Sequence, residues 1–425
     1  MIKSLKHTIQ EFTQMGGNYI FSGSFLNKVL SFASSIIAIR LLSQEMFGEL
    51  TYAYSIIQFF IPFIGLGVHF GLVRFSPLLN SEATQNGLYK QGIATGSVIN
   101  IVLFAILMVI GFTHILPADA NPYFLWIIGI QIFTLFPFEM SKSHYRVQLR
   151  NKLFASMDLS YQLCLNLLFL LLIPFIGGYG YAIALGFTPL IAFFIGKALK
   201  KGADVPTEKI NWPTKFWSYS IKSSFNSSAS QLLFYMDLFL LGFLLQNELI
   251  TGGYRTASIL PHALSFVPVA FVTTHYVHIA KNHQSATYLK SFLKKYFFLF
   301  IPLAFVSGLA LYFLAPFILN ILFGQEYAGY YPVLQILSLG LVGTFCLRIP
   351  FGNLLAGVGL ATQNLITSLI TLSINLILNM VLIPRFGIYG AAWATTISLW
   401  TSGGVALLFF TYYLNKIQHG YGQNN

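Results

Sequence analysis

Long apolar stretches alternate with short polar segments along nearly the whole chain. Each stretch has about 20 residues, the length that a helix needs to cross the hydrocarbon core of a bilayer. The pattern predicts twelve membrane-spanning helices. Their expected ranges are 17–40, 51–73, 91–115, 122–142, 153–174, 178–198, 217–243, 251–277, 296–320, 331–354, 361–383 and 387–414. Gly and Pro interrupt 51–73 and 251–277, so these two spans are the weakest.

Three polar segments flank or separate the spans. The first, 1–16, carries apolar residues at helical spacing, which favours a short helix on the cytoplasmic surface of the membrane over a simply solvated N-terminus. The longest internal one, 199–216, is predicted to be a cytoplasmic linker, and 415–425 a cytoplasmic tail. With twelve spans both termini share one side, and most of the 24 Lys and Arg residues fall on that side. The positive-inside rule makes it the cytoplasm.

Composition excludes most other classes of protein. The chain is 56% hydrophobic and 8% charged, whereas soluble domains carry roughly 25% charged residues. The net charge of +12 is not gathered into a basic block with interleaved aromatics, so no nucleic-acid partner is expected. Cys164 and Cys346 lie inside spans and indicate core packing, with no metal or cofactor. The phosphate-loop, HExxH and GxSxG motifs are absent, so no enzyme activity is expected.

One sequence string occurs twice. The pattern LIPxxGxxGxAxA begins at Leu172 and again at Leu382, 210 residues later. Pro and Gly at such a place end one helix and make a tight turn into the next. A second echo pairs Gly48 with Gly252, and a third pairs a Pro-Phe dipeptide in the fourth span with one in the tenth. The order and spacing of these echoes indicate an internal duplication.

The duplication predicts the architecture. We expect an all-α integral membrane protein whose twelve transmembrane helices form two pseudo-symmetric six-helix bundles, 17–198 and 217–414. An even number of spans in each half makes the repeats parallel, related by an axis along the membrane normal. A central cleft between two such bundles is the usual substrate site of transporters.

Three motifs resemble one known family. The run from Arg40 to Gly48, RLLSQEMFG, resembles the turn after the first helix of bacterial polysaccharide-biosynthesis flippases. The run from Asn375 to Ala392 resembles the eleventh-to-twelfth-helix signature of these proteins. Asp237, followed by Leu241, Gly242 and Tyr254, resembles their seventh-helix region. The resemblance covers nearly the whole chain.

The resemblance implies a function. These flippases belong to the multidrug, oligosaccharidyl-lipid and polysaccharide exporter superfamily, whose members work by alternating access. The implied substrate is a polyprenyl-pyrophosphate-linked oligosaccharide, moved from the cytoplasmic to the outer leaflet of the bacterial inner membrane for O-antigen, capsule or similar assembly. A polysaccharide polymerase and the membrane lipids are the partners that this role suggests.

Basic residues inside or beside the spans are the candidate substrate-binding residues. A charge in the bilayer centre costs about 2.5–3.5 kcal/mol on insertion scales, so it usually faces protein or water. Lys28 lies midway along the first span and Arg348 within the tenth; both suit a pyrophosphate, and a structural partner or snorkelling is the alternative. Lys222 is closer to the surface, which favours snorkelling. Arg40 and Arg255 at outer span ends are interface anchors or release-side phosphate contacts.

Two acidic residues are candidates for coupling to H⁺ or Na⁺. Asp237 lies deep in the seventh span, where a structural ion pair is the competing interpretation. Asp158 lies in the first turns of the fifth span, where a location near the headgroups competes.

Two other functions compete with the flippase. A cation-coupled multidrug exporter of the same superfamily would place carboxylates in the cleft, and a non-transporting membrane scaffold would need no buried cations. The deep charges of this chain are mainly cationic, which favours a pyrophosphate-bearing lipid.

Overall fold

The computed structural model describes residues 17–113, 121–148, 150–200, 206–208 and 210–420. The predicted interfacial segment 1–16 lies outside the described residues, as do parts of the linker and tail. Within these ranges the chain is helical, without strands. It forms two compact units. One is Leu30–Gly252, and the other joins residues up to Val29 with those from Gly253 onward.

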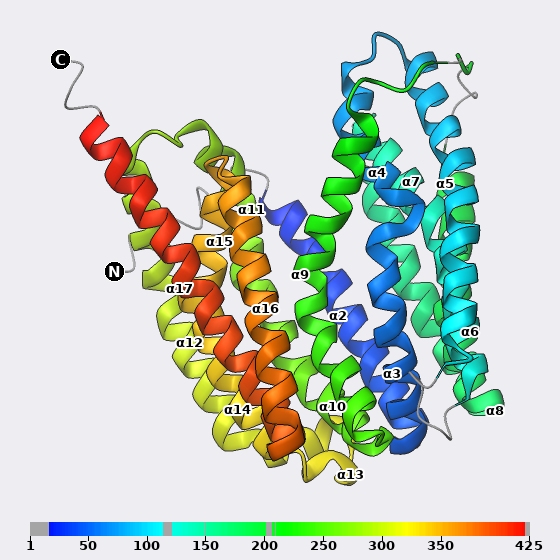
Figure 1. The fold of residues 1–425 in the computed structure, drawn as a ribbon, viewed down its shortest axis with the longest axis vertical. Helices are drawn as coiled ribbons and strands as arrows, with labels where there is room; N and C mark the ends of the chain where they lie inside the picture. Colours follow the sequence, from blue (N-terminus) through cyan, green and yellow to red (C-terminus); the bar gives the residue numbers. More distant parts are fainter. Residues whose placement is uncertain (1–16, 114–120, 149, 201–205, 209, 421–425) are drawn as a thin grey trace. The chain divides into compact units, whose positions relative to one another are not determined.

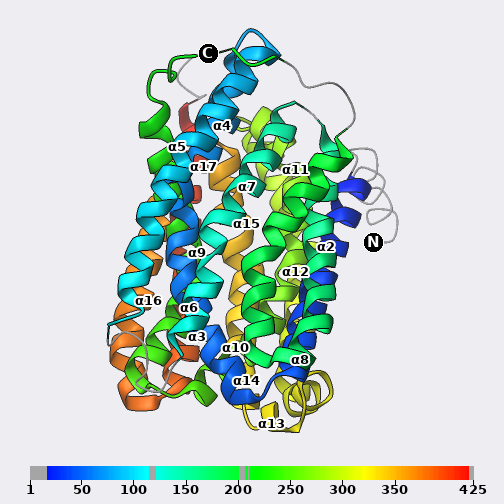
Figure 2. The same ribbon diagram turned by 90° about the vertical axis from the view of Figure 1, so that its right-hand side faces the viewer.

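The first ten helical elements run from α2 to α9. They are α2 (Gly17–Leu41), α3 (Gln44–Phe60), the 3₁₀ turn η1 (Ile61–Gly67), α4 (Val68–Phe75), η2 (Ser76–Leu78), α5 (Glu82–Ile110), α6 (Pro122–Gly129), α7 (Gln131–Val147), α8 (Asn151–Leu199) and α9 (Phe216–Leu245). Helices α4, α5 and α7 pack side by side, as Figure 2 shows. Helix α9 packs against α3, η1 and α4, within the same compact unit.

The remaining elements belong mainly to the other unit. They are α10 (Glu248–Leu264), α11 (Phe266–Lys281), α12 (Ala286–Phe323), α13 (Gln325–Ala328), α14 (Tyr331–Gly343), the π-turn η3 (Thr344–Arg348), α15 (Ile349–Gly357), α16 (Ala361–Phe386) and α17 (Ile388–Gly420). Helices α16 and α17 form an extended hairpin, orange and red in Figure 1. Helix α14 packs against both α12 and α17.

The helices have the lengths and surfaces of membrane spans. In the described part of the chain, nine helices are long and apolar enough to cross a bilayer. Large apolar side chains stand exposed on them, such as Phe175 at 84%, Phe313 at 72% and Val98 at 63% of their surface. Exposing so much apolar surface to water would be unfavourable, whereas exposing it to lipid would not. The chain is therefore an all-α, multi-pass membrane protein.

The described helices overlap the twelve predicted spans in order. Helix α8 covers two of them. Ile176 and Gly177 leave the helical conformation between these two spans. The count of twelve, the pseudo-symmetry and the central cleft stay predictions. The bundles 17–198 and 217–414 also stay a prediction, since the compact units are bounded by packing at Val29 and Gly252 and not by the repeat.

The two LIPxxGxxGxAxA strings have the same local geometry. Gly177 has φ 54° and ψ −129°, and Gly387 has φ 57° and ψ −133°. Side chains rarely tolerate this backbone conformation, so glycine is required at both corners. A Cβ on Gly180 would lie 2.6 Å from the Leu172 carbonyl oxygen, and one on Gly390 would lie 2.2 Å from that of Leu382. Each string thus builds a tight helical corner, as predicted.

Candidate functional site

Three basic residues lie near enough to His262 on α10 to act on it electrostatically. Arg255 lies seven residues earlier on the same helix, which is about two turns and therefore the same face. Lys28 comes from α2 and Arg348 from the π-turn η3. The charges of all three act electrostatically on His262. We call Lys28, Arg255, Arg348 and His262 the cation cluster; its members belong to one compact unit.

The cation cluster is partly exposed and partly buried. Lys28 is exposed, whereas Arg255, His262 and Arg348 are half-buried. Cations that are held near one another repel, so the arrangement is costly unless an anion or protein dipoles compensate. A planar guanidinium binds two phosphate oxygens at once, and an ammonium adds a mobile point charge. The cluster therefore has the donor set for a phosphate or pyrophosphate group.

Three of the five predicted substrate-binding residues belong to this cluster. They are Lys28, Arg255 and Arg348. Lys222 is exposed on α9, and Arg40 is exposed in the last turn of α2, both in the other compact unit. His262 is not among the residues predicted from the sequence, and its spacing of seven from Arg255 is the signal that could have indicated it.

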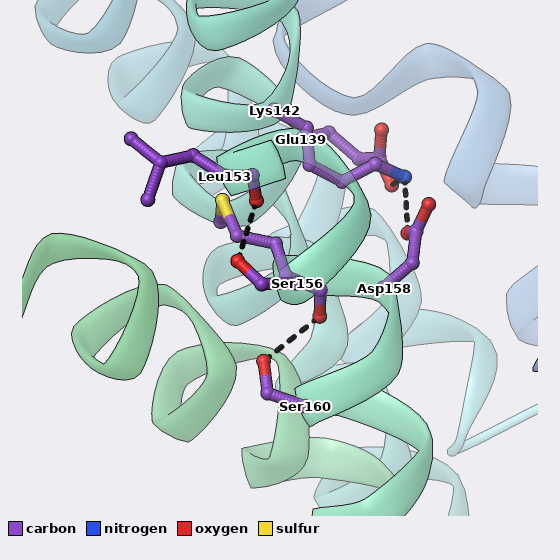
Figure 3. Close-up of polar contacts among 7 residues, drawn as sticks. Glu139, Lys142, Leu153, Ser156, Asp158 and Ser160 are labelled. Atoms are coloured by element: carbon purple, nitrogen blue, oxygen red, sulfur yellow. Dashed lines mark hydrogen bonds and ion pairs between the residues drawn. The ribbon is translucent and has the colours of Figure 1, made fainter. Parts of the chain in front are cut away.

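The predicted coupling residue Asp158 is engaged in an ion pair. The Lys142 ammonium lies 2.8 Å from Asp158 Oδ1 and 3.2 Å from Glu139 Oε1 (Figure 3). The rings of Phe138 and Phe154 lie 5.2 and 5.5 Å from the same ammonium. The Lys142 side chain keeps 15% of its surface exposed and the carboxylates 29% each. This acidic–basic triad ties α7 to the start of α8.

The sequence carries a signal for one pair of the triad. Glu139 and Lys142 are three residues apart on a helix, a spacing at which opposite charges meet. Their partner Asp158 could not be assigned without the packing of α7 on α8. The other acidic candidate, Asp237, is only 2% exposed within α9.

No metal centre is assembled in the described ranges. No group of three or more His, Cys, Asp and Glu side chains there is arranged to hold a metal ion. Cys164 and Cys346 are free thiols in different compact units.

Comparison with solved structures defines the class of fold. The chain is similar to an inward-facing multidrug resistance MATE family transporter of the MOP superfamily, with a TM-score of 0.73, 12% identity, and coverage of 92% of this chain and 96% of that one. It is similar to the lipid II flippase MurJ in an inward closed conformation, with a TM-score of 0.73, 17% identity, and coverage of 94% and 89%. A MOP superfamily transporter from Pyrococcus furiosus gives a TM-score of 0.68 at 12% identity, with 95% of both chains covered. The fold is that of MOP superfamily transporters.

Sequence comparison shows the family. The model of the polysaccharide biosynthesis protein family matches residues 15–276, more than half of the chain. The chain belongs to this family. It is 24% identical to the capsular polysaccharide biosynthesis protein CapF of Staphylococcus aureus, over 94% of this chain and 98% of that protein. It is 38% identical to an uncharacterized membrane protein of Methanocaldococcus jannaschii over 102 residues, which span 24% of this chain but only 19% of that protein.

Proposed function

We propose that the protein is a flippase that moves a polyprenyl-pyrophosphate-linked oligosaccharide from the cytoplasmic to the outer leaflet of the bacterial inner membrane. The observation that carries the proposal is the cation cluster, in which Lys28, Arg255 and Arg348 act on one imidazole. Membership in the polysaccharide biosynthesis family and the fold shared with lipid II flippase MurJ support it. The glycan would serve O-antigen, capsule or similar assembly, with a polysaccharide polymerase as the downstream partner.

The proposed mechanism is electrostatic. A pyrophosphate loses its hydration when it leaves the headgroup region, and an unpaired buried anion is strongly disfavoured. The two guanidinium groups and the Lys28 ammonium would replace the lost water with charge-assisted hydrogen bonds. The polyprenyl tail would remain in lipid. Release would follow from alternating access, because the cluster would be exposed to one membrane side at a time.

A cation-coupled multidrug exporter is the competing function. The MATE transporters among the similar structures have this fold, so the fold does not separate the two. The cation cluster favours the flippase, because a cationic drug would be repelled by three neighbouring basic side chains.

Coupling to H⁺ or Na⁺ is proposed through Asp237 and not through Asp158. The carboxylate of Asp237 is nearly fully buried in α9, and buried carboxylates in transmembrane helices often mark ion pathways. The Asp158 side chain, by contrast, keeps 29% of its surface exposed. Translocation that is unchanged after Asp237→Asn, or after collapse of both ion gradients, would refute this coupling.

A deletion strain tests the flippase. Loss of the gene is expected to leave lipid-linked oligosaccharide on the cytoplasmic leaflet and to reduce surface glycan. Complementation with Lys28→Gln, Arg255→Gln or Arg348→Gln should restore surface glycan at least about tenfold less well than the native gene, since each removes one of the three cations that are proposed to bind the pyrophosphate. Lys290→Gln, which removes an exposed lysine of α12 outside the cluster, is the matched control. Full glycan display by all three variants at normal protein level would rule out the proposed role of the cluster.

A further inference from the structure

The π-turn that carries Arg348 contains a backbone carbonyl without the usual backbone donor. In η3 the Ile349 N–H donates to the carbonyl of Thr344, five residues earlier. The next carbonyl, that of Phe345, would be paired in the same pattern by residue 350. That residue is proline, which has no N–H. Because Ile349 is already engaged and Pro350 has no donor, the helix cannot satisfy the Phe345 carbonyl.

A tyrosine from another helix supplies the missing donor. The Tyr296 hydroxyl on α12 donates to the Phe345 carbonyl oxygen over 2.8 Å. Both residues are buried, at 0% and 1% exposure. A carbonyl without a donor at membrane depth would be strongly disfavoured, and side chains of neighbouring helices commonly compensate for proline in this way. The Tyr296 hydroxyl therefore pairs a carbonyl that the π-turn leaves without a backbone donor.

Helix α17 also approaches the turn closely, at a glycine. A Cβ built on Gly403 of α17 would lie 2.4 Å from the Leu347 Cβ and 2.9 Å from the backbone nitrogen of Arg348. Only a residue without a side chain lets α17 approach the turn so closely. The adjacent Gly404 has no heavy atom within 4 Å of such a Cβ. The turn thus contacts α12 through the Tyr296 hydroxyl and α17 through the close approach at Gly403.

We infer that Tyr296 and Gly403 are positioning residues that hold the π-turn and thereby aim the Arg348 guanidinium at the pyrophosphate of the substrate. The inference rests on the proposed function and adds two residues to it. π-turns are frequent at functional sites, because they rotate the following side chain relative to a regular helix. If the turn relaxed to a regular helix, Arg348 would point elsewhere and the cation cluster would lose one of its three charges.

Binding of farnesyl pyrophosphate, a short soluble prenyl pyrophosphate, to the purified full-length protein tests the inference. Tyr296→Phe removes only the hydroxyl and is expected to weaken binding about tenfold. In an Arg348→Ala background, where Lys28 and Arg255 supply the residual affinity, the same change should have less than about a twofold effect. Tyr413→Phe is the control, because the Tyr413 hydroxyl also donates to a backbone carbonyl in this unit, that of His283, at 2.9 Å. It should not change affinity.

A second pair of variants keeps the test decisive if Tyr296→Phe does not fold. Gly403→Ala should weaken binding as Tyr296→Phe does, whereas Gly404→Ala should not. The geometry of the turn is followed without ligand through Cys346, which lies within it, after Cys164→Ser removes the other thiol. Tyr296→Phe or Gly403→Ala should change the maleimide labelling rate of Cys346 several-fold.

The outcomes distinguish the proposed binding role of the cation cluster from the positioning role of Tyr296 and Gly403. If Arg348→Ala leaves farnesyl pyrophosphate binding intact, the proposed role of the cation cluster fails and the positioning role fails with it. If Arg348→Ala weakens binding but Tyr296→Phe and Gly403→Ala do not, only the positioning role is wrong. An equal loss from Tyr296→Phe in the native and Arg348→Ala backgrounds would also overturn it, because the hydroxyl would then act independently of Arg348.

Discussion

Gly48 and Gly252, which the predicted internal duplication pairs at a distance of 204 residues, lie in direct contact. A Cβ on Gly252 would lie 3.1 Å from the Gly48 Cα, and one on Gly48 would lie 1.8 Å from the Glu248 carbonyl oxygen. The amide of Gln44 also donates to the Leu249 carbonyl over 3.3 Å. The starts of α3 and α10 therefore meet at positions that the predicted duplication relates, and each has a glycine there.

This contact predicts a stability effect. Gly48→Ala would force the backbones of α3 and α10 apart and should lower the free energy of unfolding by about 1–3 kcal/mol, the typical cost of overpacking. The melting temperature of the detergent-solubilised protein measures it. Gly329→Ala, at a position with no heavy atom within 4 Å of an added Cβ, should melt as the native protein does. Equal melting of both variants would mean that the close approach is not required.

The two helical corners predict a pair of equal effects. Gly177→Ala and Gly387→Ala should each destabilise by about 1–3 kcal/mol through backbone strain, because both positions need a conformation that alanine rarely adopts. An added Cβ would meet nothing nearer than 3.6 Å at either position, so steric clash contributes little. Thermal melting checks both variants. A loss at only one corner would contradict the equivalence of the two strings.

The triad on α7 and α8 predicts graded losses. Asp158→Asn leaves Lys142 paired with Glu139 and should lower stability by about 1 kcal/mol, since the groups are partly exposed. Lys142→Met leaves two neighbouring carboxylates without their cation and should cost about 2–3 kcal/mol. Melting curves measure both, and translocation by Asp158→Asn should persist. If Asp158→Asn abolished translocation at native stability, Asp158 would instead be a coupling residue.

The sequence predicted the helical class and the corners because these depend on local chemistry. Apolar length marks a span, and LIPxxGxxGxAxA marks a corner at Gly177 and Gly387. The helix ends were less accurate: α5 begins at Glu82 and not near 91, because Ser81 caps it outside the apolar stretch. An apolar stretch indicates only the part of a helix that contacts lipid. The helix itself can continue beyond that stretch until a capping residue ends it.

The site was predictable only in part. The cost of a charge at membrane depth singled out Lys28 and Arg348 from the sequence. Their grouping with Arg255 around His262 depends on the packing of three elements, which no local pattern encodes. The same holds for Tyr296, whose role becomes visible only when Pro350 and the π-turn are seen together. The pairing of Asp158 with Lys142 likewise required the contact of α7 with α8.

Translocation in proteoliposomes tests the central claim most directly. The purified protein would be reconstituted with a fluorescent undecaprenyl-pyrophosphate-linked sugar, and movement between leaflets followed by access of a membrane-impermeant quencher. The account predicts movement by the native protein, little by the Lys28→Gln, Arg255→Gln, Arg348→Gln triple variant, and little of a matched lipid without pyrophosphate. Equal movement of both lipids, or native rates in the triple variant, would contradict it.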